Sequence, residues 1–314
     1  IKKMKIIYFG TDNNSKLVLE DLNNSANDVE LVITSPDSIK SRGNLKSPSP
    51  VKTYCIENKL NFIEKIPDQE LIESINSDII IVASYGQIIP DNILNSSFYG
   101  AINLHPSLLP KYRGPSPVQA TIINNEKITG TTIILLNKEV DGGPIILQEK
   151  YKVNGDEYLT ELTTKLFKIG SKNIKKILDN PKLISKAETQ KEKDATYTKK
   201  INKSDGHINW NEGGTKIIQL IKALSENPGT YSNLDNKKIK IFKARFSEEK
   251  NQINNPGTLG QNEDGELYVS IYDGRIIIEE VQLEGKNKIN GPDFIRGHQI
   301  FHKLNDKKVF KKLS

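Results

Sequence analysis

Short apolar runs alternate with amphipathic stretches over the first part of the chain. Residues 78–84 (DIIIVAS) are apolar on both faces, as expected of a strand buried inside a parallel sheet. Similar runs predict strands at 5–9, 30–34, 101–105 and 131–136. Helical spacing of apolar residues predicts helices at 16–22, 51–58, 117–124 and 157–178. This alternation predicts an α/β fold with a doubly wound, mostly parallel sheet.

The pattern changes after residue 184. Residues 186–205 hold many charges and few large apolar side chains, which predicts a linker. Beyond it, the pattern predicts a helix at 216–224 and short strands at 238–244, 257–259, 266–272 and 275–281. Asp273-Gly274, between the last two strands, predicts a type I′ hairpin. We therefore expect an α/β domain over 1–185, the linker over 186–205, and a small OB-like β-barrel domain over 206–314.

Composition limits the classes of protein that fit. One Cys in 314 residues excludes a disulfide framework and a Cys-rich zinc module, and it fits a reducing compartment. The chain holds no apolar stretch near the roughly 20 residues that span a bilayer, and its first residues resemble no signal peptide. Met4 is the only Met, and we expect translation to start there. These features predict a cytoplasmic protein with no membrane partner.

Positive charge slightly exceeds negative charge. The chain has 45 Lys and Arg against 39 Asp and Glu, for a net charge of +6. This excess permits an anionic partner such as a nucleic acid, but a solvated Lys-rich surface explains it as well. The lysines gather around 191–203 and again at 303–312.

Several common catalytic signatures are absent from the sequence. It has no phosphate-binding Gly-x-x-x-x-Gly-Lys-Ser/Thr loop, no Gly-x-Gly-x-x-Gly after the first strand, and no Gly-x-Ser-x-Gly elbow. His298 and His302 have the i, i+4 spacing of a metal pair on a helix, but no nearby Glu or third ligand accompanies them. We therefore expect no metal, and an NAD-linked oxidoreductase lacks its glycine fingerprint.

Three polar residues point to a different chemistry. Asn103 and His105 alternate along a predicted strand that Pro106 ends, so both project to one side near the strand's carboxyl end. Asp141 follows another predicted strand, and we expect it at the same rim. An amide and an imidazole can stabilise the oxyanion that forms when an amine attacks an acyl carbon, each donor contributing roughly 3–4 kcal/mol. The carboxylate can orient the imidazole or carry a proton.

The sequence pattern also allows a purely structural role for His105 and for Asp141. A His at a strand end can simply satisfy local hydrogen bonds, and an Asp before Gly142-Gly143 can simply form a turn.

A resemblance favours the catalytic interpretation. Residues 103–114 (NLHPSLLPKYRG), with 141–144 (DGGP) behind them, resemble the signature of the folate-dependent formyltransferases. Three further stretches narrow the likeness to the methionyl-tRNA formyltransferase family, and with these the likeness covers nearly the whole chain: 41–52 (SRGNLKSPSPVK), 197–201 (YTKKI) with 208–210 (INW), and 227–231 (NPGTY) with 256–259 (PGTL).

The resemblance implies a reaction and a set of roles. A formyl group would pass from 10-formyltetrahydrofolate, a co-substrate, to the α-amine of methionine on initiator tRNA, giving formylmethionyl-tRNA for translation initiation. Asn103, His105 and Asp141 would be catalytic. The folate would be bound by residues of two stretches: Ser107, Leu108, Leu109 and Pro110, and Val82, Tyr85, Gly86 and Ile88. The tRNA would be bound by basic residues: Lys40, Arg42, Lys46 and Lys203. We expect the protein to act as a monomer.

Departures and rivals qualify the likeness. Asp12 and Asn13 stand where the family usually has Pro and an aromatic or apolar residue. Pro115-Ser116 stands where small residues such as Ala are usual, and Gly229 stands where an aromatic residue is common.

A formyltransferase for an amino-sugar nucleotide has the same chemistry, but the basic stretch around Arg42 and the β-rich C-terminal part count against it. A non-catalytic RNA-binding protein would not need Asn103, His105 and Asp141.

Overall fold

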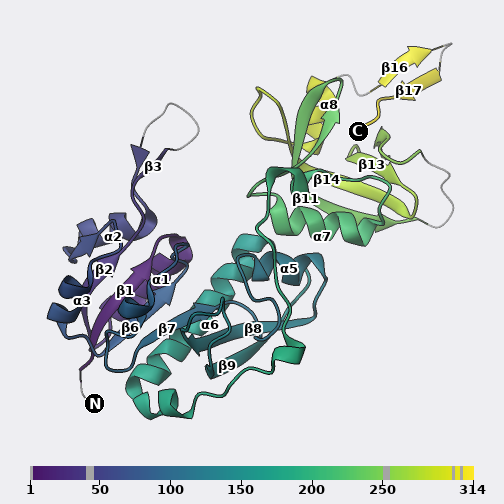
Figure 1. Ribbon diagram of the computed structural model, residues 1–314. Helices are drawn as coiled ribbons and strands as arrows, with labels where there is room; N and C mark the ends of the chain where they lie inside the picture. Colours follow the sequence, from purple (N-terminus) through teal and green to yellow (C-terminus); the bar gives the residue numbers. More distant parts are fainter. Residues whose placement is uncertain (1–2, 40–45, 250–254, 299–300, 305–306) are drawn as a thin grey trace. The chain divides into compact units, whose positions relative to one another are not determined.

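The chain forms two compact units in a computed structural model that describes residues 3–39, 46–249, 255–298, 301–304 and 307–314 (Figure 1). The first unit comprises Ile1–Pro117, Lys127–Val153 and Thr160–Lys199, and the second comprises Val118–Glu126, Asn154–Leu159 and Lys200–Ser314. Two short segments that interrupt the first unit along the sequence thus belong to the second unit. The domain boundaries expected at 185 and 205 stay a prediction.

A seven-stranded sheet organises the first unit, in the order β5-β2-β1-β6-β7-β8-β9. Its strands are β1 (Lys5–Gly10), β2 (Asp28–Ile33), β5 (Phe62–Ile63), β6 (Ile79–Ala83), β7 (Ala101–His105), β8 (Ile128–Leu135) and β9 (Ile145–Lys152). The first five strands of that order are parallel, whereas β8 and β9 are antiparallel to their neighbours. A further pair, β3 (Ser38–Ile39) and β4 (Lys46–Ser47), is antiparallel.

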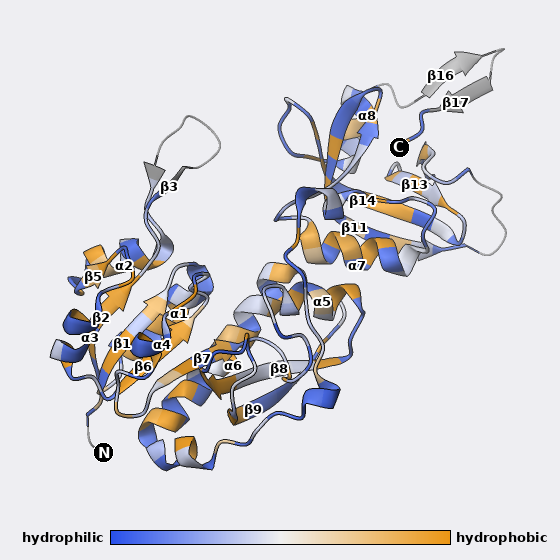
Figure 2. Cartoon of the chain, in the orientation of Figure 1, coloured by the Kyte–Doolittle hydropathy of each residue, from blue (hydrophilic) through white to orange (hydrophobic). Residues whose placement is uncertain are grey.

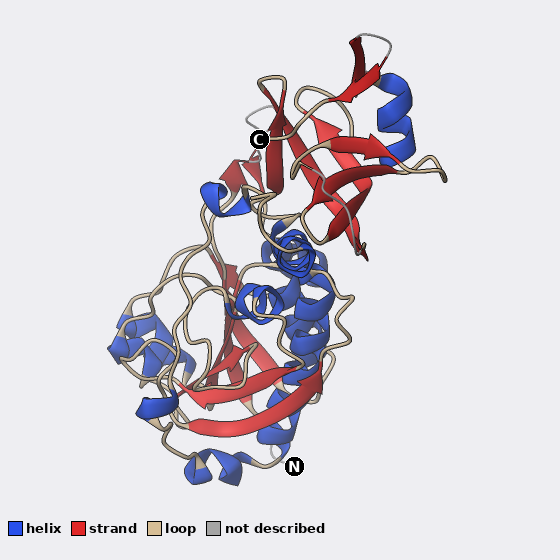
Figure 3. Ribbon diagram, turned by 90° about the vertical axis from the view of Figure 1, so that its right-hand side faces the viewer, coloured by secondary structure: helices blue, strands red, loops and turns tan. Residues whose placement is uncertain are grey.

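Helices cover both faces of this sheet, as the alternating pattern predicts (Figure 3). One core joins the sheet to α1 (Asn13–Asn23), α2 (Pro50–Asn58) and α6 (Leu159–Asp179). The other face packs against α3 (Gln69–Ile75) and α4 (Asp91–Leu94). The central strands are apolar on both faces, as Figure 2 shows for β1, β2 and β6. The predicted doubly wound, mostly parallel sheet is confirmed.

Some elements of this unit escaped the sequence pattern. The largest is the edge strand β9, in which half-buried residues alternate with exposed Gln and Lys after Ile146. Such a strand buries only one face, so its apolar run is too broken to stand out. The segment 186–205, predicted as a linker, follows the short helix η1 (Pro181–Lys186) and holds only the short helices η2 (Glu192–Asp194) and η3 (Lys203–Gly206).

The second unit is built on an antiparallel sheet in the order β10-β11-β14-β13-β12, with β15 paired to β14. Its strands are β10 (Thr230–Leu234), β11 (Lys237–Glu248), β12 (Leu259–Gln261), β13 (Leu267–Ile271), β14 (Gly274–Leu283) and β15 (Ile289–Asn290). The helices α7 (Gly214–Leu224) and α8 (Gly291–Gly297) contribute to its core, and α5 (Pro117–Ile123) lies mostly within this unit. The last strands, β16 (Phe301–Leu304) and β17 (Lys307–Phe310), pair with each other.

The final residues join the two edges of this sheet. The amide of Leu259 donates to the carbonyl of Lys311 at 2.8 Å, and the amide of Leu313 donates to the carbonyl of Gly257 at 2.8 Å. On the other edge, Asn233 and Ser314 exchange two backbone hydrogen bonds, of 2.7 and 3.1 Å. Hydrogen bonding therefore runs from β12 through the tail to β10 and closes the predicted barrel.

The hairpin between β13 and β14 exists, but its predicted turn is wrong. Ile271 pairs with Gly274, so Tyr272 and Asp273 form the loop, and neither has the positive φ that a type I′ turn requires. Gly274 instead begins β14 with a φ of +152°. A Cβ atom there would lie 2.2 Å from the carbonyl oxygen of Ser247, which explains the glycine.

The helices bear on two sequence predictions, the absence of a membrane span and the pairing of His298 with His302. Among the described residues, no helix combines the length and the apolar character needed to cross a bilayer. His298 follows the end of α8 and His302 lies in β16, so the two histidines do not share a helix.

The barrel closure yields a stability prediction. Leu313 is 3% exposed in the same core as Trp210, the only Trp of the chain. Leu313→Ala should lower the free energy of unfolding of the second unit by about 2–3 kcal/mol, because it leaves a cavity where the tail seals the core. Urea unfolding followed by Trp210 fluorescence measures this directly. Leu71→Ala, at a position 41% exposed on α3, is the control. An equal urea midpoint of unfolding for the two variants would contradict the closure of the barrel by its tail.

Candidate active site

The chain turns back on the sheet directly after β7. The segment 106–113 is held by Thr132 of the neighbouring strand β8, whose hydroxyl donates to the carbonyl of Ser107 at 2.7 Å and accepts from the amide of Leu109 at 3.2 Å. Gln148 of β9 adds hydrogen bonds of 2.9 Å to both Thr132 and the carbonyl of Leu109. The peptide bond between Leu109 and Pro110 is cis. Two strands thus fix the shape of this loop.

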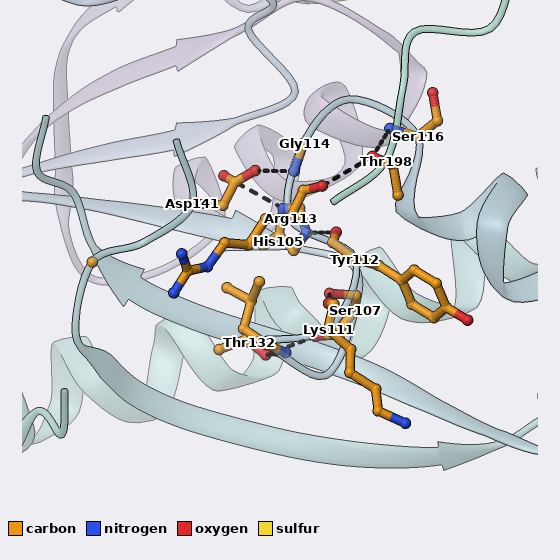
Figure 4. Close-up of polar contacts among 12 residues, drawn as sticks. His105, Ser107, Lys111, Tyr112, Arg113, Gly114, Ser116, Thr132, Asp141 and Thr198 are labelled. Atoms are coloured by element: carbon orange, nitrogen blue, oxygen red, sulfur yellow. Dashed lines mark hydrogen bonds and ion pairs between the residues drawn. The ribbon is translucent and has the colours of Figure 1, made fainter. Parts of the chain in front are cut away.

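His105, the last residue of β7, is 4% exposed and lies between two acceptors. Its Nε2 lies 2.9 Å from the carbonyl oxygen of Tyr112, which can only accept, so Nε2 is the donor. Its Nδ1 lies 3.6 Å from Oδ1 of Asp141. The carbonyl therefore fixes the orientation of the ring, while Nδ1 faces a carboxylate at a distance too long for a strong hydrogen bond (Figure 4).

Asp141 is held by its backbone and by its second oxygen. The residue has a φ of +50°, in the left-handed region that Asp tolerates better than most residues. Its Oδ2 accepts from the amide of Gly114 at 2.7 Å, and its side chain is 16% exposed. The carboxylate therefore links the loop after β8 to the loop after β7, with Oδ1 turned toward His105 (Figure 4).

The route by which Asp141 reaches His105 differs from the expected one. β8 runs antiparallel to β7, with Leu135 opposite Ile102, so the end of β8 lies beside the start of β7. The segment 136–144 must return along β7 to bring Asp141 to the other end. Gly143 permits this path, because a Cβ there would lie 1.8 Å from the carbonyl oxygen of Leu135. Loop folding, rather than a shared strand end, brings the two residues together.

Asn103 shares a strand face with His105. It is half-buried, lies two residues earlier on β7, and pairs with Val82 on one side and Ile134 on the other. Alternation along the strand places its side chain on the same side as that of His105. The structure thus joins His105 to Asp141 by a contact, and it places Asn103 beside them by register.

One predicted folate stretch, residues 82–88, begins at the end of β6 and continues in the loop after it. Val82 is 7% exposed, and Tyr85 is 4% exposed with its ring edge-on to Phe9 at 5.2 Å. The buried Tyr85 hydroxyl has no hydrogen-bond partner among the residues that the structure describes, and burial raises its pKa. Gly86 has a φ of +79° in open space, and Ile88 is 91% exposed. A ligand with a polar ring could satisfy a buried hydroxyl that has no partner among the described residues and could cover an exposed apolar side chain of the same loop.

Asp12, one of the departures from the family pattern, supports this loop. Its Oδ1 accepts from the amide of Ser15 and caps α1, and its Oδ2 accepts from the hydroxyl of Ser84 at 2.6 Å. Ser84 has a φ of +51°, so Asp12 stabilises a strained residue at the start of the predicted folate loop.

The second predicted folate stretch is the loop after β7. Ser107 is fully buried and donates to the carbonyl of Lys111 at 2.7 Å, and Leu109 is 3% exposed. Leu108 and Pro110 are half-buried. The buried hydroxyl of Ser107 holds its own loop, so its role in this arrangement is to shape the loop.

The predicted tRNA-binding residues are only partly described. Lys40 and Arg42 lie outside the described residues, as does the side chain of Lys46, whose backbone belongs to β4. Lys203 is exposed at the start of η3, which is capped by Asn202 and Asp205. Among the described residues, no cluster of three or more His, Cys, Asp or Glu could hold a metal ion.

The segment 188–198 is anchored to this site, a contact that no sequence pattern predicts. Arg113 is 1% exposed, and its backbone bonds to Thr196 and Thr198 on both sides. The Thr198 hydroxyl also accepts from the amide of Ser116 at 3.1 Å (Figure 4). Gly114 lies against this segment with a φ of +102°, and a Cβ there would lie 2.9 Å from the carbonyl oxygen of Thr198. Arg113 lies within the motif at 103–114, but no local sequence pattern predicts that its side chain is buried.

Family comparisons cover most of the chain. Residues 2–178 match the family described as formyl transferase, and residues 200–299 match the formyl transferase C-terminal domain. The chain is 36% identical over 309 residues to a methionyl-tRNA formyltransferase of Dictyoglomus turgidum, covering 95% of this chain and 97% of that protein. It is 34% identical over 304 residues to a methionyl-tRNA formyltransferase of Staphylococcus aureus, covering 94% and 96%.

Solved structures share the fold. HypX from Aquifex aeolicus in complex with tetrahydrofolic acid matches with a TM-score of 0.64 and 16% identity, over 99% of this chain and 51% of that one. The chain therefore spans about half the length of HypX. An N-formyltransferase from Helicobacter canadensis, in complex with folinic acid and dTDP-3-aminofucose, matches with a TM-score of 0.64 and 21% identity, over 88% and 99%.

The loop after β7 gives a prediction that needs no substrate. Thr132→Val removes the acceptor of the Leu109 amide, so hydrogen exchange at 107–109 should become about tenfold faster or more, since a lost buried hydrogen bond costs roughly 1–3 kcal/mol. Mass spectrometry of the exchanged peptides measures this change. Thr131→Val is the matched control, because that buried hydroxyl has only a 3.5 Å contact with Asn173. Equal exchange in the two variants would show that Thr132 does not hold the loop.

Proposed function

The chain belongs to the formyl transferase family, and from this premise we propose that it transfers the formyl group of 10-formyltetrahydrofolate to the α-amine of methionine on initiator tRNA. The product is formylmethionyl-tRNA, with which translation starts. Relatives named for this activity match over nearly the full length of both chains. The observation that carries the proposal is the placement of His105 and Asp141 beside Asn103 at the end of β7.

The bonds made and broken in formyl transfer determine which charges and protons the site must handle. The amine nitrogen forms a bond to the formyl carbon, the bond from that carbon to N10 of the folate breaks, and one proton passes overall from the amine to N10. Negative charge builds on the formyl oxygen during the attack, and each hydrogen-bond donor aimed at that oxygen contributes roughly 3–4 kcal/mol.

The three residues can share this work. The Asn103 carboxamide offers one donor on the face of β7. Nδ1 of His105 offers the second donor when the ring is the imidazolium, because Nε2–H already donates to the Tyr112 carbonyl and a neutral ring would leave Nδ1 as an acceptor. Oδ1 of Asp141 takes the proton that the amine loses, since Oδ2 is bound to the Gly114 amide. Catalytic hydrogen bonds of this kind often shorten only when substrate is bound.

We place the folate between the two loops that end β6 and β7. The buried, unpaired hydroxyl of Tyr85 and the neighbouring Val82, Gly86 and Ile88 provide polar and apolar contacts for its pterin ring. The loop of Ser107, Leu108, Leu109 and Pro110 continues this surface toward His105. No metal enters the proposed reaction.

For the tRNA we propose two kinds of contact. Lys40, Arg42 and Lys46 recognise the acceptor end, whereas Lys203 and the lysines of the linker bind backbone phosphates. We also propose that the active form is a monomer. Because charged initiator tRNA is a cytoplasmic substrate, we assign the protein to the cytoplasm.

The direct test is an assay with the purified protein, 10-formyltetrahydrofolate and methionine-charged initiator tRNA. The expected result is a blocked amino terminus on the methionine. A panel of amino-sugar nucleotides tests the rival substrate class, and formylation of a sugar but not of the tRNA would overturn the proposal. Tight tRNA binding without any formyl transfer would instead support a non-catalytic RNA-binding protein.

Removing the acid of the site gives the sharpest catalytic prediction. Asp141→Asn keeps an oxygen for the Gly114 amide and a residue type that tolerates positive φ, so the fold should persist. The kcat for Met-tRNA should fall about 10²- to 10⁴-fold, the usual contribution of general acid–base catalysis. Asp179→Asn, at an exposed position at the end of α6, is the matched control. Turnover within a few-fold of the unsubstituted protein would refute the assignment.

The two kinds of tRNA contact predict different phenotypes. Arg42→Ala should change the ratio of kcat/KM between initiator and elongator Met-tRNA, because this residue discriminates between tRNAs. Lys203→Ala should leave that ratio unchanged. It should reduce the slope of log binding affinity against log salt concentration by about one, which corresponds to the loss of one phosphate contact. Rates on both tRNAs measured from 50 to 200 mM salt separate the two. Equal losses on both tRNAs for Arg42→Ala would exclude a selective role.

A further inference from the structure

Gln190 connects the predicted linker to the backbone of Asp141. It is 8% exposed, and its amide nitrogen donates to two carbonyl oxygens at 2.7 Å each, those of Asp141 and Gly143. Its Oε1 accepts from Nε of Arg113 at 3.1 Å. One side chain therefore uses both of its amide hydrogens on the loop that carries the proposed catalytic acid.

Arg113 holds Gln190 in this position. Its guanidinium is buried and also contacts Glu192, with Nη1 at 3.2 Å from Oε1 and Nη2 at 3.0 Å from Oε2. Nη1 further donates to the hydroxyl of Tyr197 at 2.9 Å. The guanidinium lowers the pKa of Glu192, as expected for an ion pair. Gln190 is thus fixed at its oxygen by a buried cation and at its nitrogen by the loop of Asp141.

Asp141 needs such a restraint. Its φ of +50° is costly for a residue other than Gly, and such a conformation persists only where neighbouring groups over-determine it. The Gly114 amide restrains the carboxylate, whereas Gln190 restrains the backbone on both sides of Gly142. Rotation of this backbone would turn Oδ1 away from His105.

We propose that Gln190 is a positioning residue for formyl transfer: its amide fixes the backbone of Asp141 and thereby the direction in which the carboxylate points. This inference rests on the proposed function of Asp141. The three hydrogen bonds of Gln190 lie within the chain and the residue is 8% exposed, so we expect it to act on the rate of the chemical step and not on substrate binding.

The test uses Gln190→Glu in the full-length protein. The new carboxylate keeps an acceptor for Arg113 but cannot donate to the two carbonyls, so the ion pair preserves the fold while the restraint is lost. The kcat should fall roughly 10- to 100-fold, with KM for both substrates unchanged within about twofold. Gln219→Glu is the control, because Gln219 is similarly buried at 9% exposure but bonds to Asn125 within the second unit.

A double-mutant cycle shows whether Gln190 acts through Asp141. In an Asp141→Asn background, Gln190→Glu should cost less than about twofold in kcat, because the group it positions is already inactive. The proposal is overturned if the losses in kcat from the two single substitutions multiply in the double variant. It is also overturned if Gln190→Glu alone keeps a kcat within about twofold of the unsubstituted protein.

A second readout separates this proposal from the function on which it rests. Hydrogen exchange at 139–143 should become faster in Gln190→Glu than in Gln219→Glu, whether or not the protein formylates tRNA. If the unsubstituted protein fails to formylate but exchange accelerates, the proposed function fails and the backbone restraint stands. If formylation is normal and exchange is unchanged, the restraint is absent and the positioning role is refuted.

Discussion

The candidate site depends on one carboxylate that bridges two loops. Oδ2 of Asp141 accepts from the Gly114 amide at 2.7 Å, while Oδ1 faces Nδ1 of His105 at 3.6 Å. These contacts join the segment after β8 to the segment after β7, and both segments are also held by residues 188–198. Residues 186–199 of the predicted linker therefore belong to the architecture of the first unit, and their charged surface residues are attached to a buried framework, whereas residues 200–205 belong to the second unit.

The sheet explains why this bridge is needed. Because β8 is antiparallel to β7, the strand ends themselves do not bring Asp141 near His105. The loop must return along β7, and its conformation costs energy at Asp141. Hydrogen bonds from Gly114 and Gln190 stabilise that conformation. A site assembled from strained loops over a rigid sheet is a common way to hold reactive groups in place.

Local patterns predicted much of the fold and part of the site. The bounds of β7 match their prediction, because an apolar run that ends at His105-Pro106 is a strong local signal. β9 was missed because an edge strand buries one face only. The turn at Tyr272-Asp273 was misplaced because Asp-Gly is also favourable beside a turn. Gln190 lies 49 residues from Asp141, and no periodicity encodes such a contact.

We propose that the formyl group lies among Asn103, His105 and Asp141 while it is transferred. A crystal structure of this protein with a stable analogue of the formyl donor would show where that group binds. We expect the formyl oxygen within about 3 Å of the Asn103 carboxamide and of Nδ1 of His105, with the bond from Gly114 to Asp141 intact. A donor bound elsewhere, or one whose formyl group points away from His105, would contradict it.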